Sequence, residues 1–150
     1  MDKAKQVRET IKNLGYNARQ VSVKKDGGSV KVTIKVLEAA KDMKRIESAV
    51  SIFEDYQTDI SSGEILSGGN TFIFVGIDWK FQSKMIEAKR SELDELYKVI
   101  EYKNNRINKF EDKEVIYMKD ANYPCLYGIK EGENIKMYDK DSFEKNLILR

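Results

Sequence analysis

Hydrophobic residues recur at two different spacings along this chain, and each change of spacing marks a new element. Near the start, Val7, Ile11 and Leu14 are spaced like the residues of one helix face. Gly15 follows at the position where helices commonly end. The pattern predicts an amphipathic helix over residues 3–14.

Strict alternation of apolar and polar residues replaces the helical spacing over residues 21–25 and 29–36. Asp26-Gly27-Gly28 separates these two runs, and Asp-Gly between alternating runs is a strong hairpin signal. The predicted hairpin directs a stripe of lysines outward, comprising Lys24, Lys31 and Lys35.

Helical spacing returns over residues 41–57, and an apolar run over 71–78 follows a glycine-rich loop. Phe72, Phe74 and Gly76 face one side of the expected strand, and branched residues face the other. A strand that is apolar on both faces is typical of the centre of a sheet, or of a strand whose second face is also covered. The first half of the chain therefore predicts an α-β-β-α-β unit, with antiparallel-capable strands and helices on one face.

A long helix is predicted over residues 83–109, because branched apolar residues recur every seven positions. The seam of this helix comprises Ile86, Leu93, Leu96, Ile100 and Ile107. Lys89 and Lys103 occupy positions three residues after Ile86 and Ile100, where a coiled coil has apolar residues. Unpaired lysines are costly to bury, which disfavours a tightly packed coiled coil. Two alternatives stay open: the seam packs against another part of the chain, or it joins two copies in a homodimer.

Three short apolar runs predict a β meander at residues 114–118, 125–129 and 135–138, and a short helix begins near Asp141. The fold class is α+β. We expect three parts, namely an α+β domain over 1–78, a helical arm over 79–113 and a β-rich element over 114–150.

Composition narrows the possible functions. The chain has 150 residues and a net charge of +2, which argues against a broadly basic nucleic-acid binder and an acidic DNA mimic. It has no histidine, which removes Ser-His-Asp and Cys-His catalysis and histidine-ligated zinc, and we expect no cofactor or metal. Cys125 is the only cysteine, residues 1–5 are polar and no run of about 18 apolar residues occurs, so we expect a cytoplasmic protein with no secretory signal and no membrane partner.

The N-terminal half also carries a resemblance to a known family. It lies in the segments Gly15–Val23 and Asp26–Ser29, and above all in Gly-Glu-Ile-Leu-Ser-Gly-Gly-Asn-Thr at 63–71. These segments resemble the large polyvalent protein-associated domain of type 29 and its stand-alone relatives in Firmicutes phages and mobile elements. The resemblance implies a location in the cytoplasm of a bacterial host cell and a role in acting against, or protecting from, host systems. No catalytic residues can be carried over from it. The last 72 residues are not covered by it.

Candidate binding residues fall into three groups. The glycine-rich loop contributes Glu64, Ser67, Gly68, Gly69 and Asn70, and the meander contributes Tyr117, Tyr123, Tyr127 and Tyr138. Tyrosines are enriched in interface hot spots, although a plain turn and core packing are the alternatives for these two groups. The third group comprises Lys24, Lys25, Lys31 and Lys35. These lysines form either a solvated face of the sheet or a surface that contacts a nucleic-acid backbone, and no aromatic residue alternates with them.

Two functions are expected from these observations. The first is a non-enzymatic phage or mobile-element protein that inhibits a host defence complex, in the manner of an anti-CRISPR protein, by protein–protein occlusion. The alternative is a nucleic-acid-binding accessory protein of phage or plasmid replication, transfer or regulation.

Overall fold

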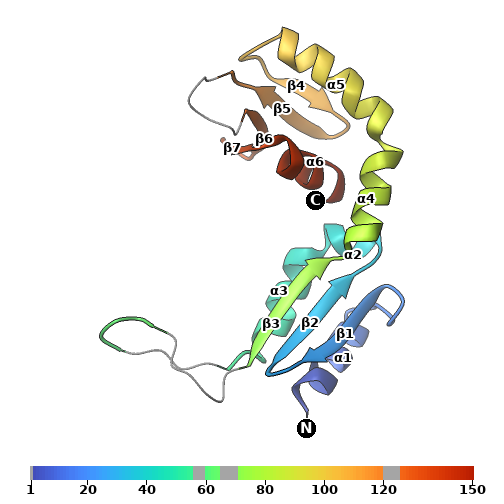
Figure 1. The fold of residues 1–150 in the computed structure, drawn as a ribbon, viewed down its shortest axis with the longest axis vertical. Coiled ribbons are helices and arrows are strands. Elements are labelled where there is room, and N and C mark those ends of the chain that lie inside the picture. The colour runs from blue at the N-terminus through green and yellow to red at the C-terminus, as the bar shows by residue number, and fades with distance from the viewer. Residues whose placement is uncertain (1, 56–59, 65–70, 120–125) are drawn as a thin grey trace. The chain divides into compact units, whose positions relative to one another are not determined.

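The computed structural model describes residues 2–55, 60–64, 71–119 and 126–150. The chain is an α+β protein that divides into two compact units, residues 1–81 and 82–150 (Figure 1). The expected helical arm over 79–113 is therefore not a separate part, because nearly all of it belongs to the second unit. No helix among the described residues combines the length and the apolar character needed to cross a membrane.

The described residues of the first unit form a three-stranded sheet and three helices. Its elements are α1 (Lys3–Asn13), β1 (Val21–Asp26), β2 (Ser29–Ile34), α2 (Leu37–Lys41), α3 (Met43–Ser51) and β3 (Phe72–Ile77). Helix α1 and the hairpin β1–β2 are confirmed. The helix expected over 41–57 is wrong in its bounds, because the chain is helical from Leu37, breaks at Asp42 and leaves the helix after Ser51.

Helix α1 shows how local sequence sets these bounds. The Asp2 carboxylate accepts a hydrogen bond from the Ala4 N–H, which caps the first turn. At the other end Gly15 adopts φ +103°, and the N–H groups of Gly15 and Tyr16 donate to the carbonyls of Lys12 and Ile11. This pair of hydrogen bonds is the Schellman motif, which ends the helix and turns the chain toward β1.

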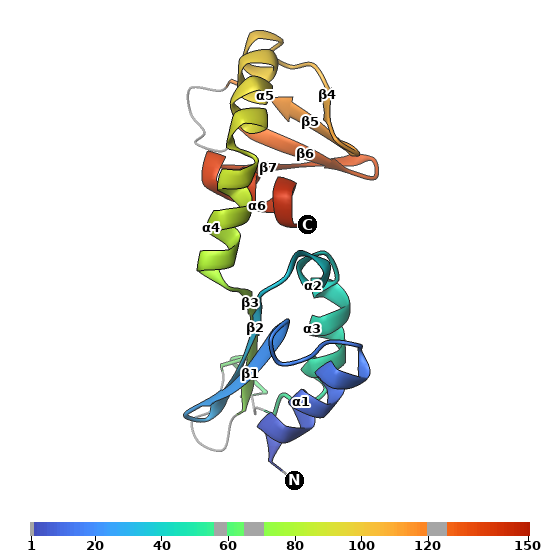
Figure 2. The same ribbon diagram turned by 90° about the vertical axis from the view of Figure 1, so that its right-hand side faces the viewer.

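The strand order β1-β2-β3 differs from the expectation for the apolar strand. β2 is central, whereas β3 is an edge strand that runs parallel to β2. The reason is the connection, since α2 and α3 return the chain to the end of the sheet at which β2 began. Both α1 and α3 lie on one face of this sheet (Figure 2), where the core contains Val7, Ile46, Val32, Ile34 and Ile73.

In the second unit, residues 82–119 and 126–150 form a four-stranded meander and helices. Its elements are α4 (Trp79–Ala88), which begins at the end of the first unit, then α5 (Arg90–Tyr102), β4 (Asn108–Phe110), β5 (Lys113–Tyr117), β6 (Tyr127–Glu131), β7 (Asn134–Tyr138) and α6 (Lys140–Leu149). The strands pair in antiparallel fashion in the order β4-β5-β6-β7. Strand β4 was not expected, and Asp139 caps α6 by accepting from the Ser142 N–H.

The long helix expected over 83–109 is wrong. The helix breaks at Lys89, whose φ of −102° and ψ of 6° lie outside the helical range, and it ends at Tyr102. Beyond that point Asn105 adopts φ +67° and donates its N–H to the Tyr117 carbonyl, so the chain turns into β4. Ile107 is therefore not on a helix, and its side chain is 48% exposed.

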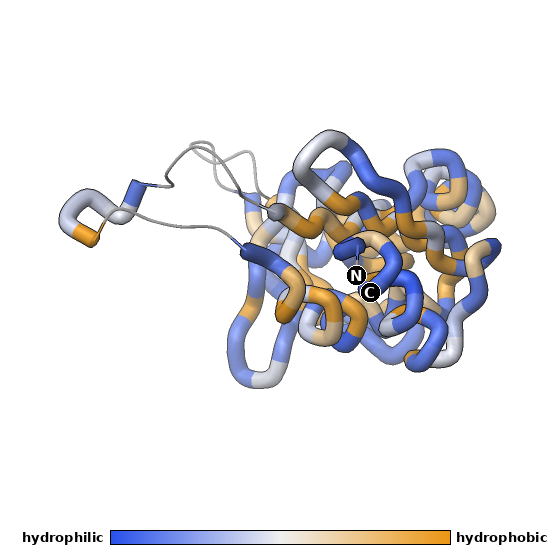
Figure 3. Tube along the Cα trace, turned by 90° about the horizontal axis from the view of Figure 1, so that it is seen from below, coloured by the Kyte–Doolittle hydropathy of each residue, from blue (hydrophilic) through white to orange (hydrophobic). Residues whose placement is uncertain are grey.

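The other four seam residues, Ile86, Leu93, Leu96 and Ile100, are buried within the single chain. Leu93 and Ile100 are completely inaccessible to solvent. Helices α5 and α6 both contact the same sheet, which explains this burial. The seam is thus intramolecular packing, and these side chains are not available for a homodimer. Along the whole trace, short hydrophobic stretches alternate with hydrophilic ones (Figure 3).

Candidate nucleic-acid interface

The sheet of the first unit has one face away from its helices (Figure 2). Alternation along the strands and the cross-strand register assign its residues in three rows. We call this surface the open face. Its rows are Asp26, Ser29 and Phe72; Lys24, Lys31 and Phe74; and Ser22, Thr33 and Gly76.

Phe74 is the most unusual residue of the open face. Its side chain is 58% exposed, although it lies in the middle of a strand. The ring stacks on Phe72 with centroids 6.3 Å apart and an interplanar angle of 29°. Two stacked rings on the surface of a sheet form a platform on which a further flat ring can lie.

The middle row joins this platform to positive charge. Lys24 pairs with Lys31 across β1 and β2, and Lys31 pairs with Phe74 across β2 and β3. Like charges directly opposite each other in a sheet destabilise the pairing. An anion bound between the two ammonium groups offsets this repulsion, so the row is suited to a phosphate next to an aromatic ring.

Gly76 makes room beside the platform. A Cβ atom at this position meets no atom within 4 Å, and its neighbours in the row are the small residues Ser22 and Thr33. The surface next to Phe74 is therefore flat and shallow. A base that stacks on the ring of Phe74 finds no side chain in its way on this side.

The structure separates the four predicted lysines. Lys24 and Lys31 belong to the open face, and Lys35 follows β2 with the same alternation as Lys31. Lys25 was grouped with them, but alternation places it opposite Val30, on the other side of the hairpin. Asp26 limits the positive charge toward the hairpin turn.

Two tyrosines of the expected patch belong to the core. Tyr127 and Tyr138 are only 6% and 8% exposed, so they cannot present a partner-binding surface. The ring of Tyr127 contacts Tyr97 and Phe143 with centroids 5.3 and 5.2 Å away, and its hydroxyl donates to Glu101 over 2.6 Å. Tyr117 is half-buried and packs on Tyr127. Tyr123 lies outside the described residues, as do Ser67, Gly68, Gly69 and Asn70 of the loop, while Glu64 is exposed.

A buried polar network holds α5 against α6 in the second unit. Glu144 is 7% exposed and accepts hydrogen bonds from Arg90 Nη1 at 2.8 Å, Arg90 Nη2 at 3.0 Å and the Tyr97 hydroxyl at 2.5 Å. Burial acts to raise the pKa of Glu144, but the hydrogen bonds from Arg90 and Tyr97 outweigh it and lower the pKa. Burial and the bond to Glu144 raise the pKa of Tyr97. Arg90 also pairs with the exposed Glu87, so the network extends from the core to the surface of α5 and α4.

Among the described residues, no group of three or more acidic or cysteine side chains is arranged to hold a metal ion. No protein-family model, no curated protein and no solved structure matches the chain. The interpretation of the open face therefore depends on its own geometry.

Sequence reasoning placed Phe72, Phe74 and Gly76 on one side of a strand but did not bring them to the lysines. The missing information was the position of β3 beside β2. A signal was present, because a helical segment between two strands favours a parallel crossover pair over a hairpin. With that pairing, the aromatic residues of β3 are neighbours of the lysines of β2.

Proposed function

We propose that this protein is a non-enzymatic, single-stranded nucleic-acid-binding accessory protein, and that the open face is its binding surface. The observation that carries the proposal is the row Lys24, Lys31 and Phe74, with Phe74 58% exposed. Proteins that bind single strands combine positive charge along the backbone with aromatic rings on which bases stack. Duplex DNA keeps its bases stacked inside, so the platform favours single strands over duplexes.

The proposal agrees with a net charge of only +2. Binding through a local row of two lysines and a ring needs no basic surface over the whole protein. It is also compatible with the resemblance of the N-terminal half to proteins of phages and mobile elements.

The test is fluorescence anisotropy with labelled DNA and RNA single strands of about 12 nucleotides, within the range that single-strand binding sites cover. Phe74→Leu keeps apolar volume but removes the stacking ring, and we expect binding about 5- to 150-fold weaker, since stacking contributes about 1–3 kcal/mol per base. Tyr102→Leu is the matched control, because Tyr102 is 88% exposed and belongs to the other unit. Equal effects of both variants, or no binding at low salt, overturn the proposal.

The lysines allow a second comparison within the same assay. Each lysine that contacts a phosphate adds about 0.7 to the slope of log affinity against log salt for single strands. Lys24→Gln and Lys31→Gln should each lower that slope, whereas Lys25→Gln on the other side of the hairpin should leave it unchanged. A uniform effect of all three variants indicates non-specific attraction and no defined site.

A second proposal is the non-enzymatic inhibition of a host defence complex by occlusion. It is supported by the resemblance of the N-terminal half and by the second sheet. Ile135 is 40% exposed on the face away from Tyr127, and Met118, directly after β5, is 42% exposed. Phage plating on defence-bearing hosts that express the protein tests it. We expect rescue of plating that Met118→Glu with Ile135→Glu abolishes, and no rescue across several defence systems contradicts it.

A further inference from the structure

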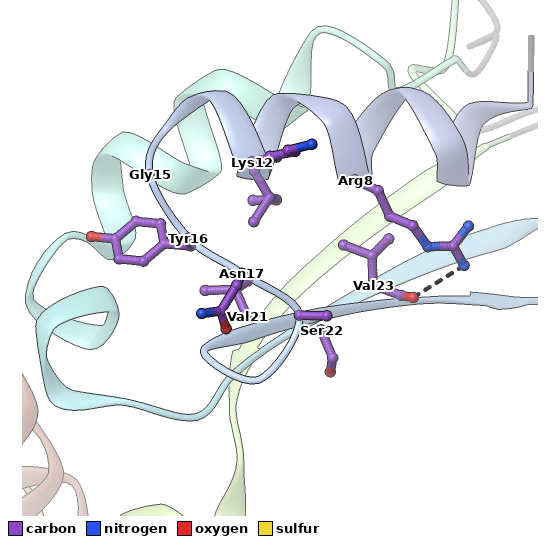
Figure 4. A pocket seen from close by; sticks show the side chains of 10 residues that line it. Arg8, Lys12, Gly15, Tyr16, Asn17, Val21, Ser22 and Val23 are labelled. Atoms are coloured by element: carbon purple, nitrogen blue, oxygen red, sulfur yellow. Dashed lines mark hydrogen bonds between the residues drawn. The ribbon is translucent and has the colours of Figure 1, made fainter.

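A groove runs between α1 and the outer edge of β1 in the first unit (Figure 4). Its volume is about 560 Å³, within the usual range for ligand sites. Ile11, Tyr16 and Val21 provide apolar walls, and the cations Arg8 and Lys12 of α1 line it as well. No carboxylate is found among the described residues that line the groove.

The floor of this groove is an edge of backbone. In the sheet that the described residues form, β1 is an edge strand, and Asp26 pairs with Ser29 across a two-residue turn. In an antiparallel pair the backbone groups point alternately to the partner strand and away from it. The backbone groups of Val23 point away from β2, because its carbonyl accepts a hydrogen bond from Arg8 Nη2 at 3.2 Å (Figure 4).

We propose that this groove binds an extended acidic peptide, which adds to the edge of β1 as a fourth strand. The backbone of such a peptide pairs with Val23 and its neighbours of the same alternation, and alternate side chains enter the apolar groove. The guanidinium of Arg8 now occupies the position of one donor of the added strand. When the peptide supplies that donor, Arg8 and Lys12 are available to pair with its carboxylates.

The geometry favours a peptide over a nucleic-acid strand at this place. A sheet edge presents alternating N–H and C=O groups, which match another strand and do not match a phosphate backbone. The apolar walls match alternate aliphatic side chains. The groove lies at the edge of the sheet and shares only Ser22 with the open face, so this inference does not depend on the nucleic-acid proposal.

The experiment uses the full chain and two labelled peptides of about eight residues, one alternating valine with glutamate and one alternating valine with lysine, with anisotropy as the readout. We expect the Val-Glu peptide to bind at least about 10-fold more tightly than the Val-Lys peptide, since charge complementarity suppresses the wrong partner. Arg8→Glu combined with Lys12→Glu should reverse this preference. The matched control is Lys3→Glu combined with Lys5→Glu, on the same helix but outside the groove.

A backbone variant tests the strand addition itself. Val23→Pro removes the N–H that points away from β2, so the pairing within the sheet is retained, as for prolines on edge strands. We expect loss of Val-Glu peptide binding with an unchanged circular dichroism spectrum. If Val23→Pro unfolds the first unit, the test depends on the double variant Arg8→Glu with Lys12→Glu alone, which should bind the Val-Lys peptide more tightly than the Val-Glu peptide. The inference is overturned if neither peptide binds, if the preference does not reverse, or if an oligonucleotide and not the Val-Glu peptide responds to the groove variants.

Discussion

Each unit of this chain places helices on one face of a sheet, yet the two units put their aromatic residues in opposite places. In the first unit Phe72 and Phe74 lie on the face away from the helices. In the second unit Tyr97, Tyr127 and Phe143 lie between the sheet and helices α5 and α6. The aromatic residues of the second unit stabilise its core, and those of the first unit remain available to a ligand.

The same contrast applies to a trio of side chains that occurs in both units. In the first unit the Asp42 carboxylate accepts from the Tyr16 hydroxyl at 2.7 Å and from Arg45, with side chains 25% and 55% exposed for Asp42 and Arg45. In the second unit Glu144 joins Tyr97 and Arg90, and its side chain is 9% exposed. The chemistry is alike, so the difference in burial should decide how much each trio contributes to stability.

The largest expected effect comes from breaking the buried trio. Glu144→Ala leaves Arg90 and Tyr97 without their common acceptor, and we expect a loss of about 2–4 kcal/mol in the free energy of unfolding. Asp42→Ala should cost less than about 1 kcal/mol, because exposed ion pairs contribute little. Urea unfolding of both variants, followed by circular dichroism, measures this. Equal losses would show that burial does not separate the two trios.

A smaller effect is expected from a glycine in each sheet. A Cβ at Gly128 lies 2.7 Å from side-chain atoms of Ile135 and Met137 and 2.9 Å from Ile116, so Gly128→Ala forces these side chains to shift. We expect a loss of about 1–3 kcal/mol. Gly76→Ala meets nothing within 4 Å and should be neutral or stabilising by about 0.5–1 kcal/mol, because alanine has less conformational entropy to lose.

Thermal unfolding of the two alanine variants makes this comparison directly. A destabilised Gly76→Ala would mean that the open face is covered by something in the folded chain. That result would also remove the flat surface next to Phe74 on which the nucleic-acid proposal depends.

The smallest effects concern the pH dependence of stability in the second unit. Folding lowers the pKa of the Glu144 carboxyl group. The ionised carboxylate therefore contributes fully to the free energy of unfolding above its ordinary pKa of 4.5, and this contribution is lost as the pH falls through the pKa of the folded state. Folding raises the pKa of the Tyr97 hydroxyl group, chiefly through burial. The neutral hydroxyl therefore contributes fully to the free energy of unfolding below its ordinary pKa of 10.0, and this contribution is lost as the pH rises from there through the pKa of the folded state. Glu144→Gln should flatten the acid limb of the stability profile of the second unit. An unchanged acid limb would contradict the assignment of this network.

Much of the fold could be predicted from the sequence, because the decisive signals were local. The hairpin at Gly27 and the end of α1 at Gly15 follow from glycines at positive φ. Strand β4 was not predictable in this way. Its turn uses Glu111 at φ +55°, a conformation that side chains other than glycine rarely adopt, so the sequence gives no turn signal there.

The prediction of one long helix over residues 83–109 is wrong for a related reason. Heptad spacing continues through Lys89 and on to Ile107, so periodicity alone does not reveal that the chain breaks twice. The site was half predictable. Lys24, Lys31 and Phe74 could each be assigned to an outward face, but their juxtaposition depends on strand order, which local patterns do not encode.

The most direct test of the open face is an NMR titration of the ¹⁵N-labelled chain with an unlabelled single-stranded oligonucleotide at low salt. We expect the backbone amide signals of Lys31, Thr33, Phe74 and Gly76 to shift first and to saturate together. Signals of Lys25 and of Ile11 in the groove beside α1 should shift little. Shifts confined to the second unit, shifts only along the α1 groove, or no shifts at all would contradict the claim that the first sheet binds a single strand through Phe74 and its two lysines.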